Sequence, residues 1–328
     1  MQVELNEQSL LHESSRRLLD WAGQELSSLG IHMSSREPKV RTRHWSIVAE
    51  MSTINGLVWA KQNAPRFLYE GRLLELLNRH APEHVVELLA LDAERGYMLS
   101  NDAGHALKGQ SELTFTLWET LIDYYASIQQ RMSEHAPEML AVDVPDLRAI
   151  QIPSNFRLML TLLDNDSELR KLISDDEIGK LHGLESSVQK WSLQLASSTI
   201  PATIEHNDLQ FGNVFSQDGL LRISDWGDAV LTHPFMCLHA FTCNVSETLH
   251  ISPSSKQISF LKRRYISHWG SPSNATLNRE ANLATVLGHL VNASTWLRLP
   301  KQAILEYPHQ GLPKQLRGFI AKASALRF

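Results

Sequence analysis

Two acidic residues and one amide stand close together between positions 204 and 228. Asn213 follows Asp208 by five residues, and Asp225 follows Asn213 by twelve. Short apolar segments flank these positions, so the polar side chains are expected at strand ends or in tight loops. A carboxylate can orient and deprotonate an acceptor hydroxyl, and Asp and Asn oxygens are ligands that Mg²⁺ accepts. The combination suits phosphoryl transfer.

Two segments of this stretch resemble the catalytic core of the aminoglycoside phosphotransferase family, which are kinase-like enzymes that act on small molecules. His-Asn-Asp-Leu-Gln-Phe-Gly-Asn at 206–213 resembles the family's His-Gly-Asp-Leu-His-x-Gly-Asn catalytic loop. Ser-Asp-Trp-Gly-Asp-Ala at 224–229 resembles its Ile-Asp-Trp-x-x-Ala metal loop. The resemblance implies that Asp208 is the catalytic base, that Asn213 and Asp225 are metal ligands, and that His206 braces the loop. Either segment alone would be typical of an ordinary turn.

A kinase-like enzyme also needs a lysine that pairs with the nucleotide phosphates and a helical glutamate that holds this lysine. Lys61 ends an apolar segment at 57–60, and Glu70 lies in the first turns of the next expected helix. We therefore predict that Lys61 and Glu70 contribute to binding ATP. Glu75 on the same helix is the alternative partner for the lysine.

The place of the phosphate-covering loop departs from the kinase pattern. No Gly-x-Gly-x-x-Gly precedes Lys61, and Arg-Thr-Arg-His-Trp-Ser stands at 41–46 instead. Arg43 or main-chain N–H groups near Ser46 are candidates for contacting phosphates. A plain exposed connection between strands is the equally open alternative. The resemblance also implies that main-chain groups from Leu99 to Asn101 hold the adenine, with Asp102 near the ribose.

The catalytic loop departs from the family at two positions and lacks one expected partner. Asn207 and Gln210 replace the family's Gly and His. The family often places an Asp shortly after a segment like His-Pro-Phe at 233–235, where it braces the loop. This chain has no Asp there, and His239 is considered as a substitute.

The elements that must position these residues fall into two groups. Apolar periodicity predicts a helix at 7–30 and an antiparallel meander at 40–61, in which Asn55-Gly56 forms the turn. A helix at 66–79 and strands at 85–91 and 96–100 complete a five-stranded sheet. The remainder is mostly helical around a β patch at 202–224, with helices expected at 111–132, 154–172, 177–198, 235–250, 255–268, 277–297 and 312–325.

These elements and the resemblance together predict an α+β chain with a bilobal protein-kinase-like fold. We expect a helical extension at 1–39, an N-lobe with a small antiparallel sheet and one helix at 40–101, and a larger, mainly helical C-lobe at 102–328. The polar segment 101–109 is the expected hinge.

Composition excludes several other classes. The two cysteines, Cys237 and Cys243, exclude a disulfide framework and a Cys-rich zinc site, and they are typical of buried thiols. Residues 1–10 have no basic region typical of a signal peptide, and no apolar run reaches the length of a membrane span. No hydrolase elbow or nucleic-acid-binding motif is present. We expect a cytoplasmic protein that binds neither membranes nor nucleic acids; its oligomeric state is not predicted.

The charge distribution is uneven. Residues 252–328 hold eleven Lys and Arg against two Glu, although the chain as a whole carries −5. This basic quarter could bind an anionic partner, or its helices could pack against the acidic remainder of the chain. An acidic group at Asp164, Asp166 and Glu168 would suit a polyamine acceptor, although such groups are usually solvated turns.

The predicted function is transfer of the γ-phosphoryl group of Mg·ATP to a hydroxyl of a small molecule. The acceptor remains open among antibiotics, sugars, amino alcohols and amino acids. The alternative is a catalytically weak nucleotide-binding pseudokinase that acts through a protein partner. A protein kinase is disfavoured, because no Ala-Pro-Glu activation segment follows Asp225.

Overall fold

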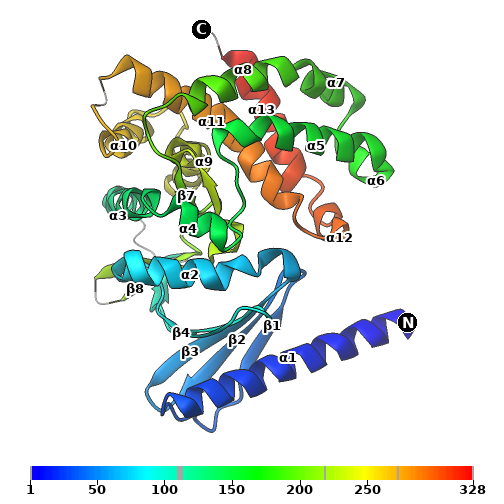
Figure 1. Cartoon of the computed structure of the whole chain (residues 1–328), viewed down its shortest axis with the longest axis vertical. Helices are drawn as coiled ribbons and strands as arrows, with labels where there is room; N and C mark the ends of the chain where they lie inside the picture. Colours follow the sequence, from blue (N-terminus) through cyan, green and yellow to red (C-terminus); the bar gives the residue numbers. More distant parts are fainter. Residues whose placement is uncertain (1, 109–113, 218, 272, 327–328) are drawn as a thin grey trace. The chain divides into compact units, whose positions relative to one another are not determined.

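The computed structural model describes residues 2–108, 114–217, 219–271 and 273–326. The chain forms two compact units. The N-terminal unit comprises the residues up to Ala106 together with Phe215–Gly227. The C-terminal unit comprises Leu107–Val214 and the residues from Asp228 onward. Figure 1 shows the elements of both units, coloured along the sequence.

The N-terminal unit is built on a five-stranded antiparallel sheet with the strand order β1-β2-β3-β5-β4. A second small sheet has the order β6-β8-β9, and β8 enters this unit at Phe215. The elements are α1 (Gln2–Ser28), β1 (Lys39–Thr42), β2 (Ser46–Thr53), β3 (Gly56–Asn63), α2 (Tyr69–His80), β4 (Leu88–Asp92), β5 (Tyr97–Asn101), β6 (His105–Ala106), β8 (Val214–Gln217) and β9 (Leu220–Ile223).

Alternating side chains give the sheet two different faces. Ile47, Ala49 and Met51 of β2 are buried on the face that packs against α1, which contributes Leu18 and Trp21 to the same core. The opposite face carries α2, so the two helices cover the two sides of the sheet (Figure 1). Val58 and Ala60 of β3 belong to the core on the α1 side. Because successive side chains of a strand point to opposite faces, the residues next to them in β3 point toward α2.

The predicted meander and the inserted helix are confirmed. A two-residue turn joins β2 to β3, and Thr53 lies opposite Gly56, whose φ of 135° suits only glycine. The structure differs from the expected segmentation in two respects. The first helix is part of the sheet's core, whereas an extension was expected at 1–39. Residues 215–227 belong to the N-terminal unit, whereas a C-lobe location was expected for them.

The C-terminal unit is mainly helical, with one two-stranded antiparallel sheet of β7 and β10. Its longest helix, α11, is buried along most of its length and packs against α5, α8, α9 and α13. The elements are α3 (Phe115–Ser133), α4 (Ala136–Ala141), α5 (Ile152–Asn165), α6 (Ser167–Arg170), α7 (Asp175–Gly183), α8 (Glu185–Ala196), β7 (Thr203–Glu205), β10 (Val230–Thr232), α9 (Cys237–Leu249), α10 (Lys256–Ser267), α11 (Ala275–Trp296), α12 (Lys301–Leu305) and α13 (Gly311–Ala325).

Two of the expected helices are each divided in the structure. The helix predicted at 154–172 ends at Asn165, because Asp166 adopts an extended conformation. The Asp166 side chain caps α6 by accepting hydrogen bonds from Glu168 N and Leu169 N. The helix predicted at 177–198 is two helices that meet at Leu184. The first residues of the helix predicted at 111–132 lie outside the described residues, and α3 begins at Phe115 after its cap Thr114.

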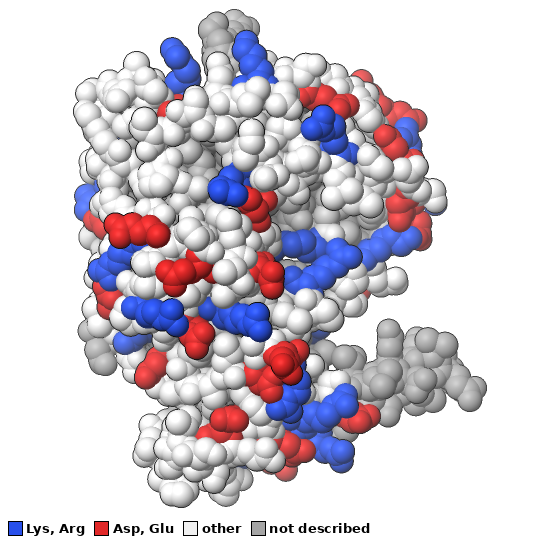
Figure 2. All heavy atoms as spheres, viewed as in Figure 1, with Lys and Arg blue, Asp and Glu red and all other residues white. Residues whose placement is uncertain are grey.

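Four of the eleven basic residues of the last quarter form ion pairs with acidic residues from earlier in the chain. These pairs lie inside the C-terminal unit and are Arg264–Asp123, Lys301–Glu168, Lys314–Glu247 and Arg317–Glu177. Figure 2 shows Lys and Arg interspersed with Asp and Glu over the visible face. These contacts favour internal pairing over a free anion-binding surface. No described helix has the length and apolar character required to cross a membrane.

Candidate active site

Three charged residues expected to serve the nucleotide meet inside the N-terminal unit. Lys61 Nζ lies 2.7 Å from Glu70 Oε2 and 2.6 Å from Asp225 Oδ1. Lys61 is on β3, on the sheet face that carries α2, and Glu70 is in the first turn of that helix. Asp225 follows β9. Strand alternation and the helix start therefore bring the lysine and glutamate together, and the return of 215–227 supplies the aspartate.

The three side chains differ in burial, and this difference sets their electrostatics. Glu70 is 2% exposed, whereas the Asp225 side chain is 53% exposed. Burial lowers the pKa of Lys61, but the negative charges of Asp225 and Glu70 outweigh burial and raise this pKa above its ordinary value. Lys61 is therefore a permanent cation, and it compensates the charge of the buried Glu70.

Gly227 allows the loop that carries Asp225 to pack directly on Glu70. A Cβ at position 227 would lie 3.0 Å from Glu70 Oε2. Tyr69 also donates a hydrogen bond from its hydroxyl to the carbonyl oxygen of Gly227. The sequence indicated Asp225 through its metal-loop pattern, whereas the contacts of Tyr69 and Gly227 depend on the tertiary fold.

Asp208, the expected catalytic base, lies in the C-terminal unit, in the loop that follows β7. Asn213 Nδ2 donates to Asp208 Oδ2 and to Asp208 O, both at 2.9 Å. His206 is fully buried, and its Nδ1 accepts a hydrogen bond from Asp208 N at 3.3 Å. Gln210 adds weaker contacts of 3.3–3.4 Å from its Nε2 to the Asp208 carboxylate. The loop therefore presents Asp208 with its carboxylate partly covered by amide donors.

Three consecutive carbonyl groups of this loop each accept a hydrogen bond from an asparagine amide. Asn292 on α11 donates to Asn207 O at 2.9 Å, and Asn244 on α9 donates to Leu209 O at 2.7 Å. Asn213 provides the third, to Asp208 O. The main chain on both sides of Asp208 is thus attached to two helices as well as to the loop itself.

Asn207 occupies a left-handed conformation with a φ of 65°, which glycine adopts freely. Glycine is the residue at this position in the catalytic-loop pattern that the sequence resembles. Asn tolerates this conformation better than most residues. Its Nδ2 donates to Thr295 Oγ1 at 2.5 Å, and Arg298 Nη2 donates to the same Oγ1 at 2.9 Å and to Asp228 O at 3.1 Å. Thr295 and Arg298, at the end of α11, thereby connect Asn207 to Asp228, where the chain re-enters the C-terminal unit.

Two further side chains secure the main-chain N–H groups of the loop. Glu205 Oε1 accepts a hydrogen bond from Asn207 N at 3.1 Å. The hydroxyl of Tyr125 on α3 accepts from His206 N at 2.8 Å and donates to Glu205 Oε2 at 2.9 Å. Neither residue was identified from the sequence. The only signal was an acidic residue at the end of a strand directly before the catalytic-loop pattern.

The expected brace, His239, does not contact the loop in the described structure. Its Nε2 is 2.8 Å from Gln315 Oε1, and its ring lies 3.6 Å from that of His289, centroid to centroid. The prediction for His239 was wrong because the inner face of α9 at this position packs against α11 and α13. Glu205 and Tyr125 make the hydrogen bonds to the loop instead.

The residues expected to contact adenine and phosphates lie in or beside the sheet. Leu99 is fully buried and lies opposite Ala60 on β3 and Ala90 on β4, so its main chain belongs to the sheet. Asn101 N already donates to Glu87 O at 2.9 Å. The Leu99 main chain thus lies within the sheet, and the contact of Leu99 and Asn101 with adenine stays a prediction.

Two other expected contacts have structural partners. Asp102 Oδ1 accepts a hydrogen bond from Trp59 Nε1 at 2.8 Å. Ser46 is 8% exposed and begins β2, and its carbonyl oxygen accepts from Arg43 N at 2.8 Å. The turn between β1 and β2 is therefore tight, and the Arg43 side chain is exposed beside it.

The acidic group considered for a polyamine acceptor is compensated by cations. Asp166 and Glu168 both pair with Lys301, and Asp164 pairs with Arg170 and with His182. The three residues lie at the junction of α5 and α6, and their ion pairs favour the alternative of a solvated surface group.

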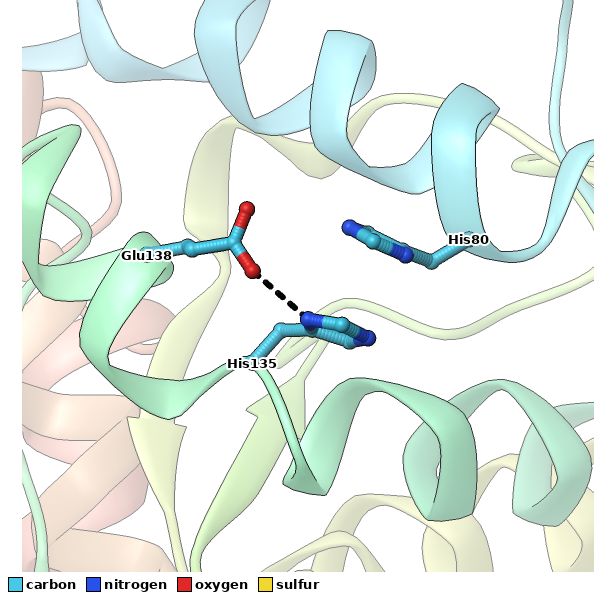
Figure 3. A group of neighbouring side chains, drawn as sticks. All are labelled: His80, His135 and Glu138. Carbon is cyan, nitrogen blue, oxygen red and sulfur yellow. Dashed lines mark hydrogen bonds and ion pairs between the residues drawn. The ribbon is translucent and has the colours of Figure 1, made fainter.

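Another pair on the C-terminal unit, His135 and Glu138, is joined by a 2.6 Å contact at the start of α4 (Figure 3). His80, which Figure 3 also labels, belongs to the N-terminal unit.

The donor atoms of Asn213 and Asp225 fit the coordination chemistry of magnesium. The Asn213 side chain donates both hydrogen bonds to Asp208 from Nδ2, so Oδ1 is the atom suited to coordinate a cation. Asp225 supplies a half-exposed carboxylate. Mg²⁺ is a hard ion that takes one or two protein oxygens together with phosphate oxygens and water. The two residues belong to different units.

The fold is that of kinase-like phosphotransferases, and three solved structures illustrate it. Plasmodium vivax ethanolamine kinase is 12% identical, with a TM-score of 0.61 over 88% of this chain and 81% of the kinase. A GDP complex of aminoglycoside 2'-phosphotransferase-IIIa is 13% identical, with a TM-score of 0.59 over 94% and 99% of the two chains. Macrolide 2'-phosphotransferase type I is 11% identical, with a TM-score of 0.56 over 94% and 97%.

The sequence itself matches no protein-family model and no curated protein. At identities of 11–13% the structural likeness shows the fold, and the predicted fold class is confirmed: α+β and kinase-like, with a small antiparallel sheet and a larger helical part. The roles of individual residues rest on the geometry of this chain.

Proposed function

We propose that this protein transfers the γ-phosphoryl group of Mg·ATP to a hydroxyl of a small molecule. The observation that carries the proposal is the position of Lys61 between Glu70 and Asp225 in a kinase-like fold. A buried glutamate that holds a lysine, next to a more exposed aspartate, is what binding of a magnesium nucleotide requires. The GDP complex of one structural neighbour supports a nucleotide as the ligand.

The residues divide the reaction between them. Asp208 accepts the proton of the acceptor hydroxyl, whose oxygen forms a bond to the γ-phosphorus. The bond between that phosphorus and the β,γ-bridging oxygen breaks, and the electron pair leaves with ADP. Lys61 offsets negative charge on the α- and β-phosphates, and Glu70 fixes the lysine. Magnesium, when bound by Asn213 and Asp225, would neutralise charge on the phosphates.

Positioning is the main contribution that the chain makes to this chemistry. Asp208 is held by contacts on both sides of its main chain, so its carboxylate needs little reorganisation. The protein also uses no covalent intermediate in this scheme. The acceptor is proposed only as a small molecule with a hydroxyl group.

The test is ADP release from Mg·ATP in the presence of hydroxyl-bearing compounds. The panel comprises sugars, amino alcohols, amino acids, aminoglycosides and macrolides, with wild type, Asp208→Asn and Asp176→Asn measured in parallel. Asp176 is an exposed α7 residue paired with Lys180, so its variant controls for loss of one carboxylate. Binding of Mg·ATP is measured separately by calorimetry.

We expect one class of compound to stimulate ADP release in wild type and in Asp176→Asn. Asp208→Asn should bind Mg·ATP but lose the stimulation, by roughly 10²-fold or more, since it lacks the general base. Retained stimulation in Asp208→Asn would refute the assigned base. Binding of Mg·ATP without turnover in any condition, together with a stable protein partner, would instead favour the pseudokinase.

A further inference from the structure

The loop before Asp208 is held by a buried acid that the proposed chemistry does not use. Glu205 is 2% exposed and ends β7, three residues before Asp208. Its two carboxylate oxygens have different partners. Oε1 accepts from Asn207 N, and Oε2 accepts from the Tyr125 hydroxyl and, at 3.4 Å, from Gln129 Nε2. A buried carboxylate is costly unless both oxygens are satisfied, and here both accept hydrogen bonds that lead to the Asp208 loop.

Tyr125 connects Glu205 to a second main-chain N–H group of the loop through its hydroxyl. A tyrosine hydroxyl has one hydrogen to donate and lone pairs that accept. Here the hydrogen goes to Glu205, and the oxygen accepts from His206 N. The main-chain N–H groups of His206 and Asn207, which precede Asp208, therefore both depend on the Glu205 carboxylate. Asn207 N–H donates to it directly, and His206 N–H donates to Tyr125, which in turn donates to Glu205.

We propose that Glu205 is a positioning residue for phosphoryl transfer, which holds the Asp208 loop in its active form through Asn207 N–H and Tyr125. This inference rests on the proposed function, because it assigns Asp208 the part of the base. The charge of Glu205 strengthens both hydrogen bonds, since bonds to an ionised acceptor are shorter and about twice as strong as neutral ones. Protonation of Glu205 weakens them and loosens the loop.

The surroundings of Glu205 place this protonation in an accessible pH range. Burial raises the pKa of Glu205 to about 7, although the hydrogen bonds from Tyr125 and Asn207 lower it. The other titratable groups around it are Cys237 on α9 and Tyr265 on α10, and burial raises the pKa of both, so they stay neutral. These residues line a cavity of about 20 Å³ with Glu205 and Tyr125, room for about one water molecule.

The experiment compares the pH dependence of ADP release from Mg·ATP in wild type and Glu205→Gln, with water as the acceptor. In wild type we expect kcat to fall as the pH decreases through about 7, the pKa to which burial raises Glu205. Glu205→Gln resembles the protonated acid, so its kcat should be lower at pH 8 by roughly tenfold or more, and flat across this range. KM for Mg·ATP should not change, because Glu205 positions the Asp208 loop and does not take part in binding the nucleotide.

Three further variants separate positioning from a general structural effect. Glu205→Asp keeps the charge and should retain the acid limb. Tyr125→Phe removes the bond that lowers the pKa of Glu205, so the limb should move to higher pH, with reduced kcat. Glu280→Gln is the matched control, because Glu280 is a second buried glutamate, on α11, whose burial also raises its pKa. It should leave the limb in place.

Hydrogen exchange of residues 203–211 provides a readout that does not require turnover. Glu205→Gln and Tyr125→Phe should speed exchange at His206 and Asn207, and Glu280→Gln should not. If wild type releases ADP but Glu205→Gln keeps the full kcat and the acid limb, this proposal is overturned while the proposed function stands. If wild type neither binds Mg·ATP nor releases ADP, the proposed function fails. Unchanged exchange in both loop variants would also overturn the positioning role.

Discussion

Lys61 Nζ lies 2.6 Å from Asp225 Oδ1, although 164 residues separate the two in the chain. The contact exists because residues 215–227 return to the N-terminal unit. Lys61 therefore serves two carboxylates at once, and the two are not equivalent. Glu70 is buried and depends on the lysine for compensation, whereas Asp225 is half-exposed and solvated.

This difference in burial between Glu70 and Asp225 predicts how the site responds to loss of Lys61. In Lys61→Met the charge of Glu70 is left buried without compensation, which should lower the free energy of unfolding by about 3–5 kcal/mol at pH 8. Burial already raises the pKa of Glu70 and Lys61 lowers it, so without the lysine the pKa of Glu70 in the folded variant should lie further above its unfolded value. The destabilisation should therefore be smallest near pH 4 and grow as the pH rises.

Urea unfolding of Lys61→Met at pH 4.5 and pH 8 checks this expectation. Lys180→Met is the control, because Lys180 pairs with Asp176 at an exposed position and should cost less than about 1 kcal/mol. Equal losses in the two variants would contradict the dependence of Glu70 on Lys61. Lys61→Arg should fold but bind Mg·ATP more weakly, because a planar guanidinium does not reproduce a compact ammonium.

Gly227 provides a second test of the same cluster. Gly227→Ala places a Cβ 3.0 Å from Glu70 Oε2, so the carboxylate or the loop must shift. We expect a loss of about 1–3 kcal/mol in stability and weaker binding of Mg·ATP. Gly179→Ala on α7 is the matched control, since nothing lies within 4 Å of the added Cβ. Calorimetric titration with Mg·ATP and thermal unfolding measure both; unaltered nucleotide affinity in Gly227→Ala would count against the cluster.

The contact between Asn207 and Thr295 predicts an effect on the Asp208 loop. Thr295→Val keeps the shape but removes the acceptor, which leaves the buried amide of Asn207 unsatisfied and should cost about 1–3 kcal/mol. Thr295→Ser retains the hydroxyl and should be close to wild type. Comparison of kcat and unfolding for the two variants tests this, and a serine variant as impaired as the valine variant would attribute the effect to packing instead.

Buried histidines predict a loss of stability in acid. Burial lowers the pKa of His239 to about 4 and that of His289 to about 3, against 6.5 for a solvent-exposed imidazole. The unfolded chain thus binds protons at a pH where the folded chain does not. Stability should decline as the pH falls from 6.5 toward 4, by at most about 1.4 kcal/mol per pH unit for each histidine.

The variant His239→Gln isolates one of these protons. Glutamine can keep the hydrogen bond to Gln315 but does not titrate, so stability should depend less steeply on pH between 6.5 and 4. His309→Gln changes an exposed histidine and serves as the control. Denaturant midpoints at several pH values measure the slopes. Identical slopes in His239→Gln and wild type would show that His239 does not contribute.

Local patterns in the sequence accounted for most of the fold and for five positions of the candidate site. Strand alternation around Lys61 and the helical period around Glu70 were sufficient to place both on one side of the sheet, and the structure shows their contact. The spacing of Asp208 and Asn213 likewise indicated a compact loop, in which they are hydrogen-bonded. Their assignment to catalysis and metal binding remains a prediction.

Other parts of the site could not be predicted, because they depend on contacts between distant segments. Tyr125 and Glu205 are 80 residues apart, and Asn207 and Thr295 are 88 apart. No periodicity encodes such pairs. The expectation for His239 failed for the same reason, since its side chain contacts Gln315 on α13 and His289 on α11, which are distant in the sequence.

The sequence by itself determined which residues are candidates for the chemistry, because a base, metal ligands and a phosphate-pairing lysine need fixed residue types at short spacings. The tertiary structure alone decided how they are held. Burial gives Glu205 its shifted pKa, α11 reaches Asn207, and the return of 215–227 brings Asp225 to Lys61. These are consequences of packing, in which the free energy of a charge or an amide depends on partners that the chain supplies from far away.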